Sequence, residues 1–214
     1  MKSVRTIGSL AALTLFLGAT AQSQSVDKRY LIVLIGPTGS GKTTQAEFLK
    51  KRFGIQTIAV DDLITANPAA LAKYRPAGIT PGPPQLNPAV DVLVASTITS
   101  LDLTKGLVLD GYPASKDQAD HLAALAAKLK LPPPIIIQID LPDDVARERA
   151  TKRKRADDTP ALIEERLKNY HREMDMIRSY YPQANIWTIN GAKPVAEVSG
   201  TIEAILMDEM PKQQ

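Results

Sequence analysis

The chain has 214 residues, of which 44% are hydrophobic and 23% are charged, with a formal net charge of +3. This length is near the upper end of a single ordinary domain and is enough for a large hydrophobic core. The sequence contains no cysteine, which excludes a thiolate nucleophile, a disulfide framework and a cysteine-based metal site.

The first segment has the features of a secretory leader. Lys2 and Arg5 precede an apolar run over residues 7–17, and an Ala-Thr-Ala step then offers a cleavage site. The run is too short for a typical membrane span. We therefore expect a signal peptide at 1–21 and an exported, periplasmic or secreted, domain at 22–214. A buried N-terminal helix in a cytoplasmic protein is the alternative. Without the leader the chain carries 24 basic and 23 acidic residues, so nothing favours nucleic acid or a membrane surface as a partner.

The first expected strand, 31–35, leads into a glycine-rich turn and a helix over 44–52. The turn fits the phosphate-binding pattern G-x-x-x-x-G-K-[ST], with Gly36, Gly41, Lys42 and Thr43 at the defining positions. Glycine allows the backbone to curl so that its N–H groups surround a phosphate. Lys42 would then lie against the outer phosphates, and the Thr43 hydroxyl could hold Mg²⁺. A glycine-rich turn without a chemical role is the alternative.

The rest of the chain alternates between expected strands and helices. Strands are expected at 55–60, 107–110, 135–139 and 186–189, and helices at 88–100, after Ser115, at 142–154, 160–180 and 195–210. Proline and glycine crowd residues 67–88, which indicates a loop-rich insertion without core elements. The alternation predicts an α/β fold: a parallel five-stranded sheet with helices on both faces.

Two further features favour phosphate chemistry. Asp110 ends an apolar strand, where a carboxylate could serve the same Mg²⁺ as Thr43, although an aspartate there is often only a turn former. Arg149 and Arg153 lie four residues apart on one helix face, and Arg166 follows on the next helix. Converging guanidinium groups would neutralise a transferring phosphoryl group. A solvated helix end and a nucleic-acid patch are the alternatives for these cations.

Several motifs together carry a family resemblance. They are G-P-T-G-S-G-K-T-T-Q-A, then L-D-G-Y-P with Gln118-Ala119, then Arg155-x-Asp157-Asp158 with Arg166-Leu167 and Tyr170. Over nearly all of residues 30–205 the sequence resembles the adenylate kinase family of nucleoside monophosphate kinases. The resemblance implies a P-loop kinase fold with a monophosphate-binding insertion at 61–100 and a short lid at 150–157.

The resemblance also implies roles for individual residues. ATP would be bound by Gly36, Gly39, Ser40, Gly41, Lys42, Thr43, Thr44 and Arg149. The monophosphate would be bound by Asp62, Gly111, Tyr112, Gln118, Arg155 and Arg166, with Gln118 reading the base. The catalytic cations would be Lys42, Arg149, Arg153, Arg155 and Arg166; Thr43 and Asp110 would serve the metal; and Asp157 and Asp158 would form the lid hinge.

The chain departs from the family at two positions that usually carry arginine. Thr65 and Ala114 stand where those arginines hold the acceptor phosphate. Each lost charge-assisted contact is worth ~1.5 to 3 kcal/mol, so the acceptor would bind less tightly by several powers of ten. Possible replacements are Lys73, Arg75 and Lys116.

The implied function is Mg²⁺-dependent transfer of the γ-phosphoryl group of ATP to a nucleoside monophosphate, with AMP as the first candidate. Its partners would be ATP and this small acceptor, and the protein is expected to be a monomer. Two alternatives stay open at this point. One is a P-loop kinase with a different small-molecule acceptor, and the other is a nucleotide-binding protein with little turnover.

Overall fold

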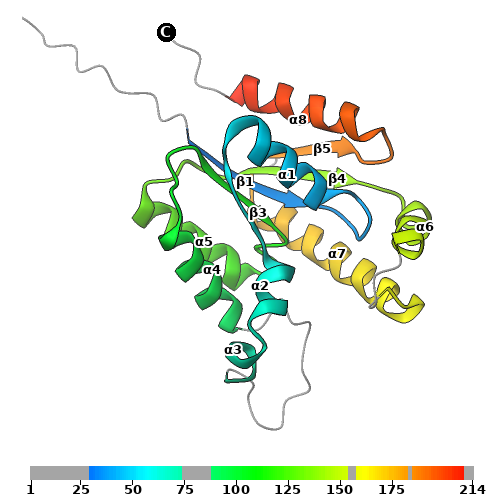
Figure 1. Cartoon of the computed structure of the whole chain (residues 1–214), viewed down its shortest axis with the longest axis horizontal. Coiled ribbons are helices and arrows are strands. Elements are labelled where there is room, and N and C mark those ends of the chain that lie inside the picture. The colour runs from blue at the N-terminus through cyan, green and yellow to red at the C-terminus, as the bar shows by residue number, and fades with distance from the viewer. Residues whose placement is uncertain (1–28, 74–87, 154–157, 183–184, 210–214) are drawn as a thin grey trace, which may run out of the picture.

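The computed structural model describes residues 29–73, 88–153, 158–182 and 185–209. In these residues the strands form one parallel sheet of five strands in the order β2-β3-β1-β4-β5, as Figure 1 shows. The strands are β1 (Tyr30–Ile35), β2 (Gln56–Ala59), β3 (Gly106–Asp110), β4 (Ile135–Asp140) and β5 (Ile186–Asn190). The predicted α/β fold with five parallel strands is confirmed.

Helices cover both faces of the sheet (Figure 1). The cluster on one face includes α1 (Lys42–Phe53) and α8 (Val195–Glu209), and the cluster on the other includes α4 (Pro88–Ser100), α5 (Lys116–Leu129) and α7 (Pro160–Tyr180). The short helices α2 (Val60–Ala66) and α3 (Pro68–Lys73) precede α4, and α6 (Asp143–Arg153) packs against α7 through a separate apolar cluster. Both faces are therefore apolar, as a covered parallel sheet requires.

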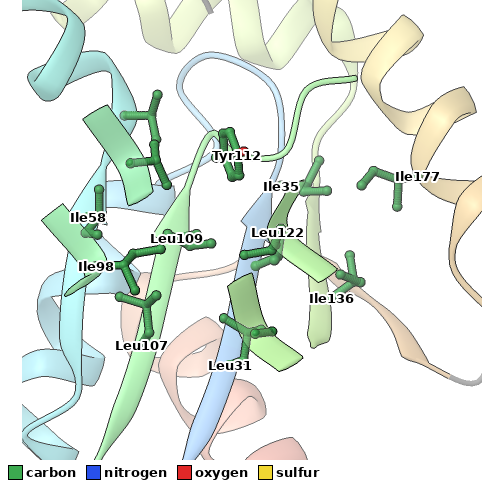
Figure 2. Packing of buried hydrophobic residues seen from close by; sticks show 14 of the residues in the cluster. Leu31, Ile35, Ile58, Ile98, Leu107, Leu109, Tyr112, Leu122, Ile136 and Ile177 are labelled. Atoms are coloured by element: carbon green, nitrogen blue, oxygen red, sulfur yellow. The ribbon is translucent and has the colours of Figure 1, made fainter. Parts of the chain in front are cut away.

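The central strand β1 is apolar on both of its faces. Leu31 and Val33 contribute to the cluster under α4, α5 and α7, whereas Ile32 and Leu34 contribute to the cluster under α1 and α8. All four side chains are fully buried. Figure 2 shows the first of these layers, with β3 residues such as Leu109 packed beside β1. An uninterrupted apolar strand is thus needed because both of its faces pack against helices.

Two of the expected helix starts are confirmed by their caps. The Ser115 hydroxyl accepts a hydrogen bond from the backbone N–H of Gln118 at the start of α5. The Thr159 hydroxyl accepts one from Leu162 N at the start of α7. Each bond satisfies one of the free N–H groups that every helix N-terminus carries.

Two expectations are wrong. The second strand ends at Ala59 and not at residue 60, because Val60 is already the first residue of α2. Within the expected loop 67–88, residues Pro68–Lys73 form α3, since proline is favoured at the first position of a helix.

Residues 74–87 of that loop, the leader at 1–21 and the lid residues 154–157 lie outside the described residues. None of the helices in the described ranges combines the length and apolar character needed to cross a membrane.

Candidate active site

The candidate site lies at the central strand β1, from which the strand order continues to either side of the sheet. The strand β1 pairs with β3 on one side and β4 on the other, and the register places Leu34 of β1 beside Asp110 of β3. The phosphate-binding loop, residues 36–43, leaves the carboxyl end of β1, so it starts next to the Asp110 carboxylate. Open parallel sheets bind ligands at such points, because successive connections there leave to opposite faces.

Two glycines of the loop are required by its geometry, Gly36 by lack of space and Gly41 by its backbone conformation. A Cβ atom on Gly36 would lie 2.6 Å from Ile139 O and 2.6 Å from the Ser40 hydroxyl. Gly41, directly before α1, has φ +96°, a conformation that only glycine adopts at little cost. The Ser40 hydroxyl is buried and has no hydrogen-bond partner within the described residues. The loop therefore has the tight curl that the sequence predicted.

Lys42 lies across the opening of this loop. Its ammonium group donates hydrogen bonds to the backbone carbonyls of Gly36 at 2.7 Å and Pro37 at 3.3 Å. Carbonyl oxygens hold the ammonium group at the loop without neutralising it. Together with the N-terminus of α1, whose free N–H groups point into the same loop, Lys42 makes the site suitable for a phosphate chain.

Thr43 and Asp110 come together as predicted. The Thr43 hydroxyl donates a hydrogen bond to Asp110 Oδ2 at 3.0 Å. Burial raises the pKa of the Asp110 carboxyl, and this effect is opposed by the positive charge of Lys42 and by the hydrogen bond from Thr43. A hydroxyl and a carboxylate are hard oxygen donors of the kind that Mg²⁺ prefers.

These two donors suit a metal that is held mainly by its substrate. Among the described residues, no group of three or more histidine or carboxylate side chains is arranged to hold a metal ion by itself. Mg²⁺ in phosphate-transfer sites is usually bound through one or two protein oxygens and the substrate phosphates. Thr43 and Asp110 fit that requirement.

Two of the predicted arginines converge beside the loop. Arg153 and Arg166 both donate to Asp158, at 2.8 Å and 2.9 Å. Arg153 also donates to the hydroxyl of Thr38 in the phosphate-binding loop, at 3.1 Å. The Asp158 side chain is only 1% exposed, whereas the arginines keep 30% and 33% of their side-chain surface in water. Asp158, predicted as a hinge residue, therefore anchors two guanidinium groups at the edge of the site.

Arg149 lies close to the loop, but its guanidinium group does not join this pair. It donates to the backbone carbonyls of Gly191 at 2.8 Å and Ala192 at 3.2 Å, in the turn between β5 and α8. A Cβ atom on Gly39 would lie 3.0 Å from the Arg149 Cβ atom. The helix α6 thus packs directly against the loop and holds Arg149 on the side away from Asp110.

Tyr112 and Gln118, two of the expected acceptor residues, lie in and just after the segment that follows β3. The Gln118 Oε1 atom accepts a hydrogen bond from Ala114 N at 2.8 Å. Tyr112 is buried, and its hydroxyl donates to Asp91 Oδ1 at 2.9 Å. Gln118, the expected reader of the base, therefore supports the loop backbone through its carbonyl oxygen.

The remaining expected residues are placed as follows. Thr44 is exposed in the first turn of α1, and Asp62 is exposed in the first turn of α2. Gly111 follows β3 directly with φ +83°. Arg155 and Asp157 lie outside the described residues.

Comparison with known proteins agrees with this geometry. Residues 34–186 match the family model described as adenylate kinase. The chain is 31% identical over 183 residues to an adenylate kinase of Stenotrophomonas maltophilia, covering 82% of this chain and 98% of the relative. It is 30% identical over 189 residues to one of Mesorhizobium japonicum, covering 82% and 96%. The chain belongs to the adenylate kinase family. It is thus an enzyme of the nucleoside monophosphate kinase class, and the predicted resemblance is confirmed.

The sequence analysis did not predict Glu173, a carboxylate that interacts electrostatically with Lys42 and Asp110 of the adenylate kinase site. Glu173 lies on α7 three residues after Tyr170 and four before Ile177, both of which are buried against the sheet. Burial raises the pKa of Glu173 to about 7; the positive charge of Lys42 opposes this, and the negative charges of Asp61 and Asp110 add to it. No sequence pattern singled it out, because Glu173 lies at the edge of the apolar face of α7, directly before the buried Met174.

The shifted pKa of Glu173 predicts a dependence of stability on pH. Between its ordinary pKa of 4.5 and about 7, the folded protein keeps a proton that the unfolded chain has released, so stability falls as the pH rises through this window. Glu173→Gln stays neutral, and should be more stable than the wild type by about 2 to 3 kcal/mol at pH 8.

Urea unfolding of the nucleotide-free protein at pH 4 and pH 8 measures this effect. At pH 4 the variant and the wild type should have nearly equal free energies of unfolding. Glu165→Gln, at an exposed position on the same helix, is the matched control and should show no such change. An equal difference between Glu173→Gln and the wild type at both pH values would contradict the assignment.

Proposed function

We propose that this protein transfers the γ-phosphoryl group of ATP to AMP and so forms two molecules of ADP. The relatives named above are adenylate kinases that align over nearly their whole length. They give no support to the two alternatives, an unrelated small-molecule acceptor or a binding protein with little turnover. The site offers no cysteine nucleophile, and transfer between phosphates requires none.

The observation that carries this proposal is the meeting of positive groups around the loop. Lys42 lies at the loop opening, where its ammonium group donates to two backbone carbonyls, at 2.7 Å and 3.3 Å. Arg153 donates to the hydroxyl of Thr38 in the same loop, at 3.1 Å. Arg166 lies beside Arg153, because both guanidinium groups bind Asp158. A triphosphate bound in the loop would therefore have an ammonium group and two guanidinium groups around its outer end.

In the reaction, an oxygen of the AMP phosphate forms a bond to the γ-phosphorus while the bond from that phosphorus to the β–γ bridging oxygen breaks. The attacking oxygen is already anionic, so no general base has to remove a proton. Lys42 would neutralise charge on the γ-phosphoryl oxygens, and Arg153 and Arg166 would do so from the other side. Catalysis then consists mainly of positioning and charge neutralisation.

Enzymes that transfer phosphoryl groups from ATP generally use Mg²⁺ together with the nucleotide. In this chain Thr43 and Asp110 would hold the ion, directly or through water. When bound, Mg²⁺ neutralises charge on the ATP phosphates. The hydrogen bond between the two side chains, 3.0 Å long, keeps their oxygens together.

On the acceptor side, Thr65 and Ala114 occupy the two positions at which the family usually has arginine. The Thr65 hydroxyl donates a hydrogen bond to the backbone carbonyl of Asp61, one turn earlier in α2. Lys116, considered as a replacement, is exposed and bonded to Asp120 at 2.7 Å. The side chains of Lys73 and Arg75 lie outside the described residues. Weak binding of AMP is therefore part of the proposal.

A panel of acceptors tests the function. The protein is mixed with ATP, Mg²⁺ and each common nucleoside monophosphate in turn, over acceptor concentrations up to the millimolar range, and the diphosphates are quantified. AMP should give ADP with the highest kcat/KM. Formation of product only with an acceptor that is not a nucleotide, or ATP binding without any product, would contradict the proposal.

We also propose that residues 1–21 direct the protein out of the cytoplasm. The support is the order of cations, apolar run and small residues in the sequence. N-terminal sequencing of the protein recovered from its native host tests this. A chain that begins near residue 22 would support export, and an intact N-terminus in the cytoplasmic fraction would contradict it.

A further inference from the structure

The segment between β3 and α5 is fastened by two side chains from different helices. Gln118 of α5 accepts a hydrogen bond from the backbone N–H of Ala114, at 2.8 Å. Asp91 of α4 accepts one from the Tyr112 hydroxyl, at 2.9 Å. The first contact is local, whereas the second joins residues that are 21 positions apart. Asp91 is therefore a polar link between α4 and this segment, in addition to the apolar cluster that Tyr112 shares with α4 residues.

The environment of Asp91 makes this bond strong. Only 16% of its side chain is exposed, and Tyr112 is 3% exposed. Burial, followed by the negative charge of Asp91, raises the pKa of Tyr112, so the phenol keeps its proton and always donates. The second oxygen of Asp91 lies 3.3 Å from Nδ1 of His121, an exposed residue of α5. A hydrogen bond to a charged acceptor in such a place is stronger than one between neutral groups.

The position of Tyr112 connects this bond to the site. Tyr112 follows Asp110 by two residues, and Asp110 is bonded to Thr43 of the phosphate-binding loop. Figure 2 shows the Tyr112 ring just beyond the end of β3, at the edge of the cluster that also contains Ile35 at the end of β1. A displacement of the ring would therefore act first on the segment after β3, which the family resemblance assigns to the acceptor, whereas Lys42 is held separately by the carbonyls of Gly36 and Pro37.

We propose that Asp91 is a positioning residue for the acceptor nucleotide, which acts by holding the Tyr112 ring through its hydroxyl. This inference rests on the proposed function, since it assigns a residue to the acceptor half of that reaction. It predicts a specific kinetic pattern: loss of the bond raises KM for AMP and leaves both KM for ATP and kcat nearly unchanged.

The test compares Asp91→Ala, Tyr112→Phe and the double variant. Each single change should raise KM for AMP about tenfold, as expected for one lost hydrogen bond to a charged group. The double variant should be no worse than the poorer single variant, because both changes remove the same bond. Calorimetric titration with AMP should show the same loss of affinity. Tyr112→Phe removes the same hydrogen bond and keeps the ring, so it provides the measurement if the alanine variant does not fold.

Asp117→Ala is the matched control. Asp117 occupies the first turn of α5 as Asp91 occupies the first turn of α4, and it is exposed, so its removal tests the general effect of losing a carboxylate there. KM for AMP should not change in this variant. An unchanged KM for AMP in an active Asp91 variant, or fully additive effects in the double variant, would overturn the inference alone. A wild-type protein that does not phosphorylate AMP would overturn both the proposed function and this inference.

Discussion

Replacing Lys42 with alanine is expected to reduce phosphoryl transfer by about 100- to 1000-fold, the usual effect of removing one donor that stabilises transition-state charge. The ammonium group donates to the carbonyls of Gly36 and Pro37 at the loop opening, and we expect the fold to be retained without it. Steady-state kinetics with ATP and AMP measure the loss, and circular dichroism and thermal unfolding establish that the fold is retained.

Lys51→Ala is the control for this experiment. Lys51 lies on the same helix, α1, is exposed, and belongs to its last turn. Its removal takes away one positive charge at a distance from the loop and should leave kcat unchanged. Wild-type turnover in the Lys42 variant would show that this ammonium group does not contact the reacting phosphates.

Replacing Gly106 with alanine is expected to destabilise the fold by about 3 to 5 kcal/mol, the combined cost of overpacking and of a strained backbone. Gly106 has φ +98°, and a Cβ atom there would lie 2.0 Å from Tyr30 O and 2.3 Å from Tyr30 N. Backbone atoms of β1 cannot move away as a flexible side chain could. A decrease of the melting temperature on the order of 10 °C should follow.

Gly106 also matters for the site, because Tyr30 and Gly106 form the first pair of the register that places Leu34 beside Asp110. Gly200→Ala provides the contrast, since a Cβ atom there has nothing within 4 Å and the residue lies inside α8. Alanine should stabilise that helix by about 0.5 to 1 kcal/mol. If Gly106→Ala unfolded at the wild-type temperature, the register at the start of β1 and β3 would be wrong.

The sequence predicted the central part of this protein well because local signals and long-range packing agree there. An apolar strand followed by a glycine-rich turn has few structural solutions, and Asp110 at the end of a second apolar strand could then be expected beside Thr43. The five strands and the capped starts of α5 and α7 followed from the same kind of agreement.

Other features depend on contacts that spacing does not show. The helix α3 was missed because the composition of 67–88 suggested a loop, although Asn67-Pro68 carries the same start signal as Asn87-Pro88. Arg149 bonds to the turn after β5 instead of joining Arg153, since its direction depends on how α6 packs. The bond between Asp91 and Tyr112 depends on the placement of α4, and no local pattern announces it.

In the proposed reaction, the loop at Gly36–Thr43 holds ATP so that its terminal phosphoryl group passes to AMP. Following the label from ATP marked with ³²P in its γ-phosphate, in the presence of Mg²⁺ and AMP, tests this most directly. We expect the label to appear in the β-phosphate of newly formed ADP, with two molecules of ADP formed for each AMP consumed. Label recovered only in ATP or as inorganic phosphate would contradict the account.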